Sequence, residues 1–144
     1  MTNLDYAGTV PESIADANYV ALTTYRKDGT ARATPVWIAD LGDGTLGFTT
    51  ASSSYKVKRL AHNPVVLLQP SDSRGKPKAD AAVLAGTATV HTDDATFAKV
   101  RDRIKQKYGI QFRAIALFGS MAKLIGKGSG TDAAVVVTLD PPTG

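Results

Sequence analysis

The chain has 144 residues, of which 43% are hydrophobic and 21% charged, with a formal net charge of +4 and no cysteine. This composition is typical of a globular domain with a sizeable core, and it excludes disulfides, thiolate metal sites and cysteine nucleophiles. No apolar run approaches the roughly 20 residues of a membrane-spanning helix, and residues 1–6 lack the pattern of a secretory signal peptide. We therefore expect a single domain over residues 1–144, in the cytoplasm and without membrane contact.

The first 50 residues predict a short helix followed by three strands in a meander. The helix is expected over Pro11–Asn18. Alternating, β-branched segments predict the strands, which are Tyr19–Tyr25, Ala31–Ala39 and Thr45–Thr50. Asp28-Gly29 is a strong hairpin signal, and Gly42-Asp43-Gly44 supplies the second turn.

The remainder of the chain predicts three more strands and three helices. The expected strands are Val65–Gln69, Ala82–Val90 and Ala133–Leu139, and the expected helices are Ser54–His62, Asp93–Tyr108 and Arg113–Ile125. The second of these helices has apolar residues at spacings of three, four and four, and Gly109 ends it. Six strands with tight turns and no regular βα alternation predict a mainly-β fold, a small antiparallel barrel with flanking helices.

The basic residues are unevenly distributed along the sequence. Residues 1–52 hold six acidic and three basic residues, whereas residues 53–78 hold one acidic residue, Asp72, and six basic ones. These six are Lys56, Lys58, Arg59, Arg74, Lys76 and Lys78. If the fold brings the two basic segments together, they form a positive patch suited to a phosphorylated cofactor, a polyglutamate tail or nucleic acid. The alternative interpretation of these bases is an ordinary solvated face.

The segment Thr49–Pro64 predicts a phosphate-binding helix terminus. A strand ends at its start, a run of hydroxyl side chains follows, and three cations occupy the first two turns of the helix, namely Lys56, Lys58 and Arg59. Cations are disfavoured at the positive end of a helix dipole, and an anion bound to the exposed amides removes the conflict. By helix angle Lys56 and Arg59 share a side, whereas Lys58 points away from them.

Pro35 lies inside the second predicted strand, where it cannot donate a hydrogen bond to a neighbour. Its position marks a sheet edge, a bulge or a place where the backbone meets a ligand. Trp37, the single tryptophan, lies two positions further and on the same face of a regular strand. A flat ring ligand could use this wall, and a core tryptophan beside an edge proline is an equally good interpretation.

The sequence offers no set of side chains that predicts chemistry without a cofactor. No glycine-rich dinucleotide or Walker motif follows a strand, and the two histidines have no acidic cluster to complete a metal site. No base is placed beside the serines, so we assign no catalytic residue. Tyr55 is the one aromatic residue among the bases of 53–78, which disfavours a nucleic-acid partner. The reactive group of an enzyme would come from a cofactor.

Several short patterns, in this order and spacing, resemble those of a known family. They are Thr34-Pro35-Val36-Trp37, Thr49-Thr50, Ser54-x-Lys56 and Leu60-x-x-Asn63-Pro64, within a region from Asn18 to Val90. The chain resembles the split-barrel flavin/deazaflavin oxidoreductases. It is most similar to the pyridoxine-phosphate-oxidase-class enzymes of the B-type group, which depend on coenzyme F-420, an 8-hydroxy-5-deazaflavin.

The resemblance implies a six-stranded antiparallel split β-barrel that forms a homodimer with the cofactor at the subunit interface. The residues implied to lie along the cofactor ring are Thr34, Pro35, Val36 and Trp37, and those implied to hold the phosphate are Thr49, Thr50, Ser54 and Lys56. Lys58 or Arg59 would lie near the anionic tail of the cofactor. Arg74 and Lys76 could reach the ligand from the partner subunit.

The predicted function is hydride transfer between coenzyme F-420 and a small unsaturated or carbonyl-like organic acceptor. Flavin-binding relatives often carry arginine at the position of Thr34, so the threonine favours the deazaflavin. The segment Gly128–Asp132 is less basic than the subgroup resemblance leads us to expect. The alternatives are an FMN-dependent enzyme of the same fold and a non-catalytic carrier of the deazaflavin.

Overall fold

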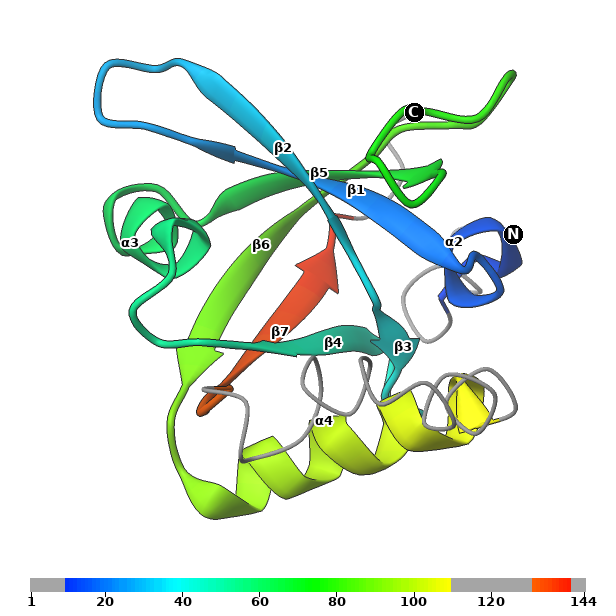
Figure 1. Cartoon of the computed structure of the whole chain (residues 1–144), viewed down its shortest axis with the longest axis vertical. Helices are drawn as coiled ribbons and strands as arrows, with labels where there is room; N and C mark the ends of the chain where they lie inside the picture. Colours follow the sequence, from blue (N-terminus) through cyan, green and yellow to red (C-terminus); the bar gives the residue numbers. More distant parts are fainter. Residues whose placement is uncertain (1–9, 110–130, 141–144) are drawn as a thin grey trace.

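The computed structural model describes residues 10–109 and 131–140, and its centre is one antiparallel sheet (Figure 1). The strands are β1 Tyr19–Tyr25, β2 Ala31–Val36, β3 Ala39–Asp40, β4 Thr45–Thr50, β5 Val65–Ser71, β6 Leu84–His91 and β7 Ala133–Leu139. The helices are α2 Glu12–Ala15, α3 Tyr55–His62 and α4 Asp94–Lys107. The seven strands follow the order β2-β1-β5-β6-β7-β4-β3.

The two edges of the sheet, β2 and β3, are consecutive in the chain, so the sheet has to curl for the chain to connect them. The prediction of one continuous strand over Ala31–Ala39 is wrong, because the chain leaves the sheet at Trp37 and Ile38. The first half pairs with β1 and the second half with β4, so the predicted meander is also wrong. The curled sheet confirms the predicted mainly-β, split-barrel fold class.

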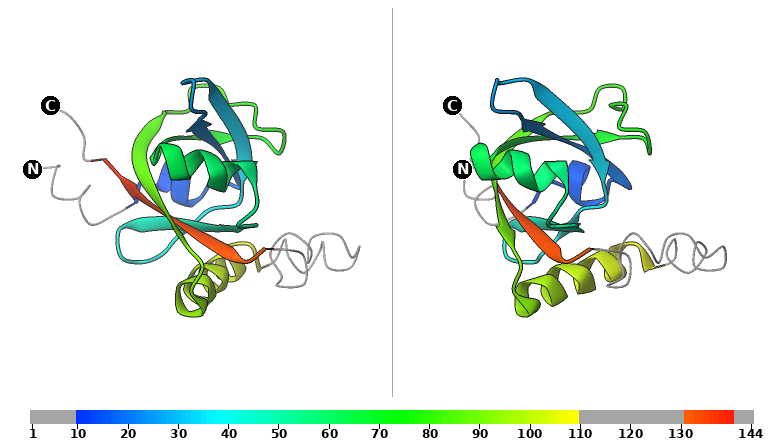
Figure 2. Two further views of the ribbon diagram at one scale, coloured as in Figure 1. Left: turned by 90° about the vertical axis from the view of Figure 1, so that its left-hand side faces the viewer. Right: turned by 60° about the vertical axis from the view of Figure 1, so that its left-hand side comes forward.

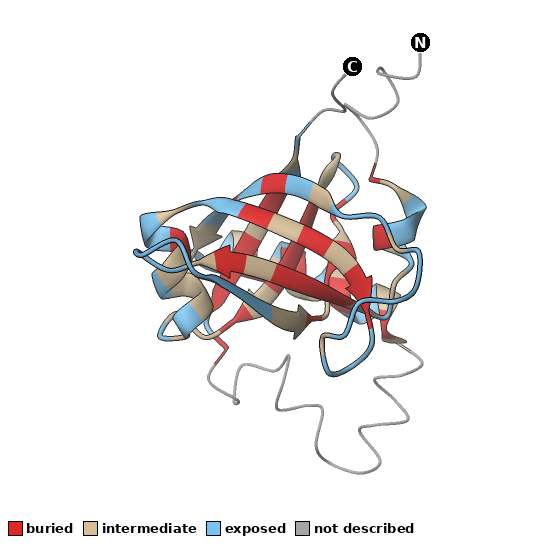
Figure 3. Ribbon diagram, turned by 90° about the horizontal axis from the view of Figure 1, so that it is seen from above, coloured by how far each residue is buried: buried red, intermediate tan, exposed pale blue. Residues whose placement is uncertain are grey.

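The core fills the inside of the curled sheet. Alternate residues of each strand point inward, as the bands of buried residues in Figure 3 show. The largest members of this cluster are Leu22, Ile38, Leu46, Phe48 and Leu68. Ile14 of α2 and Leu60 of α3 join the cluster from two different helices. Figure 2 shows α3 lying over one open end of the barrel.

The long helix α4 packs on the outer face of the sheet, beside β3, β4 and β7. Val100 and Ile104, two of the periodic apolar residues, form a second buried cluster there. Gly47 of β4 permits this contact, because a Cβ at that position would lie 3.0 Å from a methyl group of Val100. The predicted helix Asp93–Tyr108 is confirmed with Asp93 as its N-cap, and the predicted helix Arg113–Ile125 lies outside the described residues.

Two side chains from the last turns of α4 donate hydrogen bonds to backbone carbonyls along the unpaired edge at β3. The guanidinium Nε of Arg103 donates to the carbonyl oxygen of Asp40 at 2.7 Å, and Lys107 Nζ donates to that of Ile38 at 2.5 Å. An uncovered edge strand is a site for unwanted pairing with other chains, and here side chains of α4 cover it. The bases near the end of α4 therefore bind a strand as well as meeting the favourable end of the helix dipole.

Lys107 gives the protein a pH-dependent stability. Burial lowers the pKa of its ammonium to about 8, against a smaller opposing effect of Asp16. Between about pH 8 and 10.5 the unfolded chain holds this proton and the folded chain does not, so the lysine's contribution to stability rises with pH. We expect the free energy of unfolding of the wild type, relative to Lys107→Met, to increase from pH 7.5 to 9.5. Urea denaturation of both proteins at the two pH values measures this difference. A difference that does not change with pH would contradict the lowered pKa of Lys107.

None of the helices in residues 10–109 is long and apolar enough to cross a membrane. No group of three or more histidine, aspartate or glutamate side chains in the described part of the chain is arranged to hold a metal ion. The cytoplasmic location stays a prediction.

Candidate functional site

The helix α3 is positioned by a hydroxyl cap at its first turn. Ser54 Oγ accepts a hydrogen bond from the amide of Val57 at 3.3 Å, and Thr50 Oγ1 lies 3.5 Å from the same oxygen. The amides of Tyr55 and Lys56 precede the first intrahelical hydrogen bonds and have no partner within the helix. The predicted helix terminus is thus present. Ser54 caps it, and the amides of Tyr55 and Lys56 are free to bind an anion.

Because α3 is short, its three cations do not all lie at the positive end of the helix dipole. The helix has eight residues, so Arg59 belongs to its last turn, where a cation is favourable. Lys56 and Lys58 lie among the first four residues of the helix. The conflict that predicted an anion therefore rests on these two lysines, and the position of Arg59 has a second explanation in the helix dipole.

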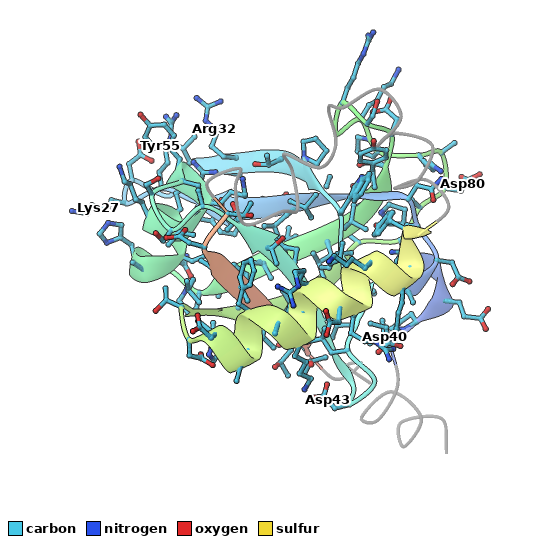
Figure 4. The ribbon with its side chains drawn as sticks, turned by 60° about the horizontal axis from the view of Figure 1, so that its bottom comes forward. Lys27, Arg32, Asp40, Asp43, Tyr55 and Asp80 are labelled. Atoms are coloured by element: carbon cyan, nitrogen blue, oxygen red, sulfur yellow. The ribbon has the colours of Figure 1, made fainter. Side chains whose placement is uncertain are left out.

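A cavity of about 570 Å³ lies between α3 and the β1–β2 hairpin. Its lining residues are Arg26, Lys27, Arg32, Tyr55, Lys58, Arg59 and His62, which we call the basic pocket. The four residues from α3 have spacings of three, one and three, so they form a single helix face. Figure 4 shows the labelled Lys27, Arg32 and Tyr55 together at one corner of the molecule, away from Asp40, Asp43 and Asp80.

Arg59 occupies the inner wall of the basic pocket. Its Nε donates to the buried hydroxyl of Thr24 at 2.5 Å. Burial lowers the pKa of the Arg59 guanidinium, and repulsion from Arg26 and Arg32 lowers it further. No carboxylate in residues 10–109 or 131–140 forms an ion pair with these three arginines. The carboxylate of Asp28 in the hairpin turn interacts with Arg26 without forming an ion pair, so the pocket keeps an excess of positive charge.

Lys56 lies next to this pocket but does not line it. Its ammonium is half-buried, and burial lowers its pKa, with a further contribution from the charge of Arg59. No hydrogen-bond or ion-pair partner of its ammonium is found among the described residues. Since Arg59 interacts electrostatically with Lys56 and with the arginines of the hairpin, these side chains form one continuous band of positive charge.

The hydroxyl residues before α3 divide between the two faces of the sheet. Thr50 lies on the inner face and is buried, whereas Thr49, its neighbour in β4, points to the outer face. Asp132 accepts hydrogen bonds from the backbone amide and the hydroxyl of Ser52, at 2.7 and 2.8 Å. The predicted set of Thr49, Thr50 and Ser54 is therefore not assembled on one side within this chain. The turn at Ser52, which precedes α3, is bound by the carboxylate of Asp132.

The segment Thr34–Trp37 is also divided by the fold. The side chain of Val36 belongs to the barrel core. Pro35 faces the opposite side, where the loop at Gly75 covers it, since a Cβ on that glycine would lie 3.2 Å from the proline ring. Because β2 is an edge strand and Arg26 N donates to Thr30 O, strand alternation places the nitrogen of Pro35 on the free edge. The edge interpretation of the proline is confirmed.

Trp37 follows the end of β2 and turns toward α4. Its ring stacks on that of Tyr108 with centroids 4.3 Å apart and an interplanar angle of 5°. Tyr19 makes an edge contact with Trp37 at 6.3 Å. Trp37 is partly buried, and it packs against the second cluster, which includes Val100 and Ile104.

The pocket contains residues that the sequence did not single out. Arg26, Lys27 and Arg32 are the three bases of the acidic N-terminal segment, and the hairpin brings all of them to α3. The second basic segment, which includes Arg74 and Lys76, does not join them within one chain. It follows β5, whose seven residues span about 20 Å from the end of α3. The one local signal that could have indicated these bases was the Asp28-Gly29 hairpin turn, which they flank.

The donor set of the site fits an anionic cofactor. A half-buried lysine without an acidic partner, an arginine fixed by a buried threonine and three further cations on the hairpin all suit phosphate and carboxylate groups. Tyr55, which is 74% exposed, and Trp37 offer flat apolar surfaces. None of the residues that line the pocket is an aspartate, a glutamate or a cysteine, and no metal site is found in the described residues.

Comparisons with known proteins agree with this fold. A family model described as pyridoxamine 5'-phosphate oxidase matches residues 8–140. Among solved structures, an F420 reductase aligns with a TM-score of 0.60 and 22% identity over 93% of this chain and 97% of its own. HupZ from Group A Streptococcus aligns with a TM-score of 0.61 and 12% identity, over 92% and 90% of the two chains.

A heme binding protein from Mycobacterium smegmatis aligns with a TM-score of 0.57 and 18% identity, over 96% of this chain and 51% of its own. No curated protein matches the sequence. At these identities the solved structures support the fold alone. The match of the family model covers most of the sequence, from before β1 to the end of β7. The chain therefore belongs to the pyridoxamine 5'-phosphate oxidase family.

Proposed function

We propose that this protein is a coenzyme F-420-dependent oxidoreductase that acts on a small unsaturated or carbonyl-like organic acceptor. The observation that carries the proposal is the band of positive charge from Lys56 through Arg59 to Arg26 and Arg32, with which no described carboxylate forms an ion pair. A cofactor with a phosphate and a polyglutamate tail presents several anions in a row and so suits a continuous band. An F420 reductase among the structural relatives is consistent with this choice.

The chain's own residues would bind and orient the cofactor. Lys56 and the cap of α3 would hold the phosphate, and the basic pocket would hold the carboxylates of the tail. The hydroxyl of Thr24 keeps the guanidinium of Arg59 in place for such a contact. Trp37 would border the ring and exclude water from one side of it. When bound, the deazaflavin supplies the hydride, and the protein contributes position and hydrogen bonding.

One titration tests the cofactor. Because Trp37 is the single tryptophan, its emission reports directly on a ring that binds beside it. We expect coenzyme F-420 to quench this emission with saturation, and FMN to bind at least tenfold more weakly. Tighter binding of FMN would identify the protein as a flavin enzyme of the same fold. Saturation with F-420 but no reduction of any acceptor would favour a carrier, and no binding of either would refute the proposal.

We also propose that the protein is a homodimer with the cofactor at the subunit interface. The free edge of β2 supports this, because Ala31 and Ala33 are exposed and strand alternation leaves their backbone groups without a partner strand. The partner's surface would complete a ring site that one chain leaves divided. Light scattering after size-exclusion chromatography should give twice the chain mass of 15.1 kDa, and a mass of one chain would refute the dimer.

A further inference from the structure

The end of α4 makes an unusual set of contacts with the point where the sheet breaks. Tyr108 is 1% exposed and has the largest side chain among the fully buried residues of the described chain. Its hydroxyl lies 3.0 Å from the carbonyl oxygen of Asn18 and 3.3 Å from the amide nitrogen of Ile38. Further carbonyl oxygens lie at 3.3 Å, on Ile38, and at 3.4 Å, on Ala17.

The hydroxyl can serve both a donor and an acceptor at this point. Burial raises the pKa of the Tyr108 hydroxyl well above its usual range, so the proton stays on the oxygen. With one proton it donates to one carbonyl at a time, the nearest being that of Asn18, and it accepts from the amide of Ile38. Lys107 donates to the carbonyl of Ile38. The backbone groups of Ile38, next to Trp37, are thus bound by the last residue of α4 and by its C-cap.

The ring of the same tyrosine supports Trp37. The two rings are nearly parallel at a centroid distance of 4.3 Å, while Tyr19 contacts the indole by an edge. Tyr108 therefore fixes both the backbone that follows Trp37 and the plane of its side chain. Stacked aromatic pairs and buried hydroxyl contacts each restrict the partner to a narrow range of orientations.

We propose that Tyr108 is a positioning residue for the ring of the cofactor, acting through Trp37, while the cations of the basic pocket act on the anionic groups independently. This inference rests on the proposed function, because it requires a ring ligand beside Trp37. It separates two contributions to binding. One is ring placement, which depends on the end of α4, and the other is anion attraction, which depends on α3 and the hairpin.

The test compares two ligands in two variants of the full chain. Tyr108→Phe keeps the ring and removes the hydroxyl, and Tyr108→Leu removes both. Coenzyme F-420 probes the ring and the anions, whereas inorganic pyrophosphate probes the anions alone. We expect F-420 affinity to fall about fivefold in Tyr108→Phe, the effect of one hydrogen bond, and more than tenfold in Tyr108→Leu. Pyrophosphate affinity, measured by calorimetry, should stay within twofold in both.

The free protein supplies a readout that does not need the cofactor. The fluorescence anisotropy of Trp37 should fall in Tyr108→Leu, because the indole loses its stacking partner, and should change little in Tyr108→Phe. Tyr25→Phe is the matched control, since Tyr25 lies at the hairpin end of β1 and the variant also loses one phenolic hydroxyl. Because Tyr25 is remote from Trp37 along β1, the variant should leave the anisotropy of Trp37 unchanged.

The outcomes are distinguishable. Equal loss of F-420 and pyrophosphate affinity in a variant would assign Tyr108 a general structural role and overturn the inference. Unchanged F-420 affinity in a folded variant would overturn it as well, and Tyr108→Phe decides the matter if Tyr108→Leu does not fold. Failure of the wild type to bind F-420 and FMN would refute the proposed function instead.

Discussion

Replacing Lys56 by methionine is expected to weaken the binding of coenzyme F-420 more than tenfold and to make the free protein more stable. A charge-assisted contact with a phosphate contributes about 1.5–3 kcal/mol, which the variant loses. In the free protein the half-buried ammonium has no acidic partner among the described residues, and burial lowers its pKa. Burial therefore makes the charged ammonium costly in the folded chain, and methionine retains the apolar stem without that cost.

The two effects have opposite signs, and together they distinguish a ligand-binding lysine from a structural one. Fluorescence titration gives the affinity, and thermal unfolding without ligand gives the stability. Lys105→Met is the matched control, since Lys105 is exposed on α4 and its loss changes the net charge equally. We expect neither property to change in the control. A Lys56→Met variant that binds F-420 as the wild type does would remove the central claim about this site.

Replacing Gly86 by alanine is expected to destabilise the fold by about 2–3 kcal/mol, which corresponds to a decrease of Tm of roughly 5–10 °C. A Cβ at this position would lie 2.5 Å from the carbonyl oxygen of Thr138 and 3.2 Å from the Cα of Leu139. Both are backbone atoms of β7, paired directly with β6. Relief of the contact requires the two strands to move apart in the middle of the sheet.

The comparison variant is Gly47→Ala. Its Cβ would meet side-chain methyl groups of Val100 and Leu41 at 3.0 and 3.1 Å, and these can shift by rotamer changes. We expect it to be less destabilising than Gly86→Ala, as measured by urea denaturation of both. A reversed order would show that the contact between α4 and β4 is more rigid than the pairing of β6 with β7.

Local patterns in the sequence identified most of the elements correctly. The strands Tyr19–Tyr25, Thr45–Thr50 and Ala133–Leu139 have their predicted bounds, because alternation and β-branched residues are local signals. The strand break at Trp37 was missed. At the break, Lys107 and Tyr108, the last residue and the C-cap of α4, bind the backbone of Ile38 from about 70 residues away. A contact of this sequence separation leaves no mark on the alternation of the strand itself.

The anion site was predicted only in part. The cap of α3 and its cations follow from a short segment, so Ser54, Lys56, Lys58 and Arg59 could be named from the sequence. Helix angle placed Lys58 away from Lys56, yet Lys58 and Arg59 line the same pocket and Lys56 does not. Which cations of α3 line the pocket depends on the side from which the β1–β2 hairpin approaches the helix.

The sequence by itself determined that this chain forms an antiparallel β fold with a capped, cation-bearing helix, since turns, caps and periodicity are set by neighbours in the chain. Only the tertiary structure decided which cations act together. The curl of the sheet brings the hairpin bases Arg26, Lys27 and Arg32 to α3, and β5 carries Arg74 and Lys76 away from it. The electrostatic potential depends on distances in space, so a count along the sequence found the bases of α3 but paired them with Arg74 and Lys76 instead of the hairpin bases.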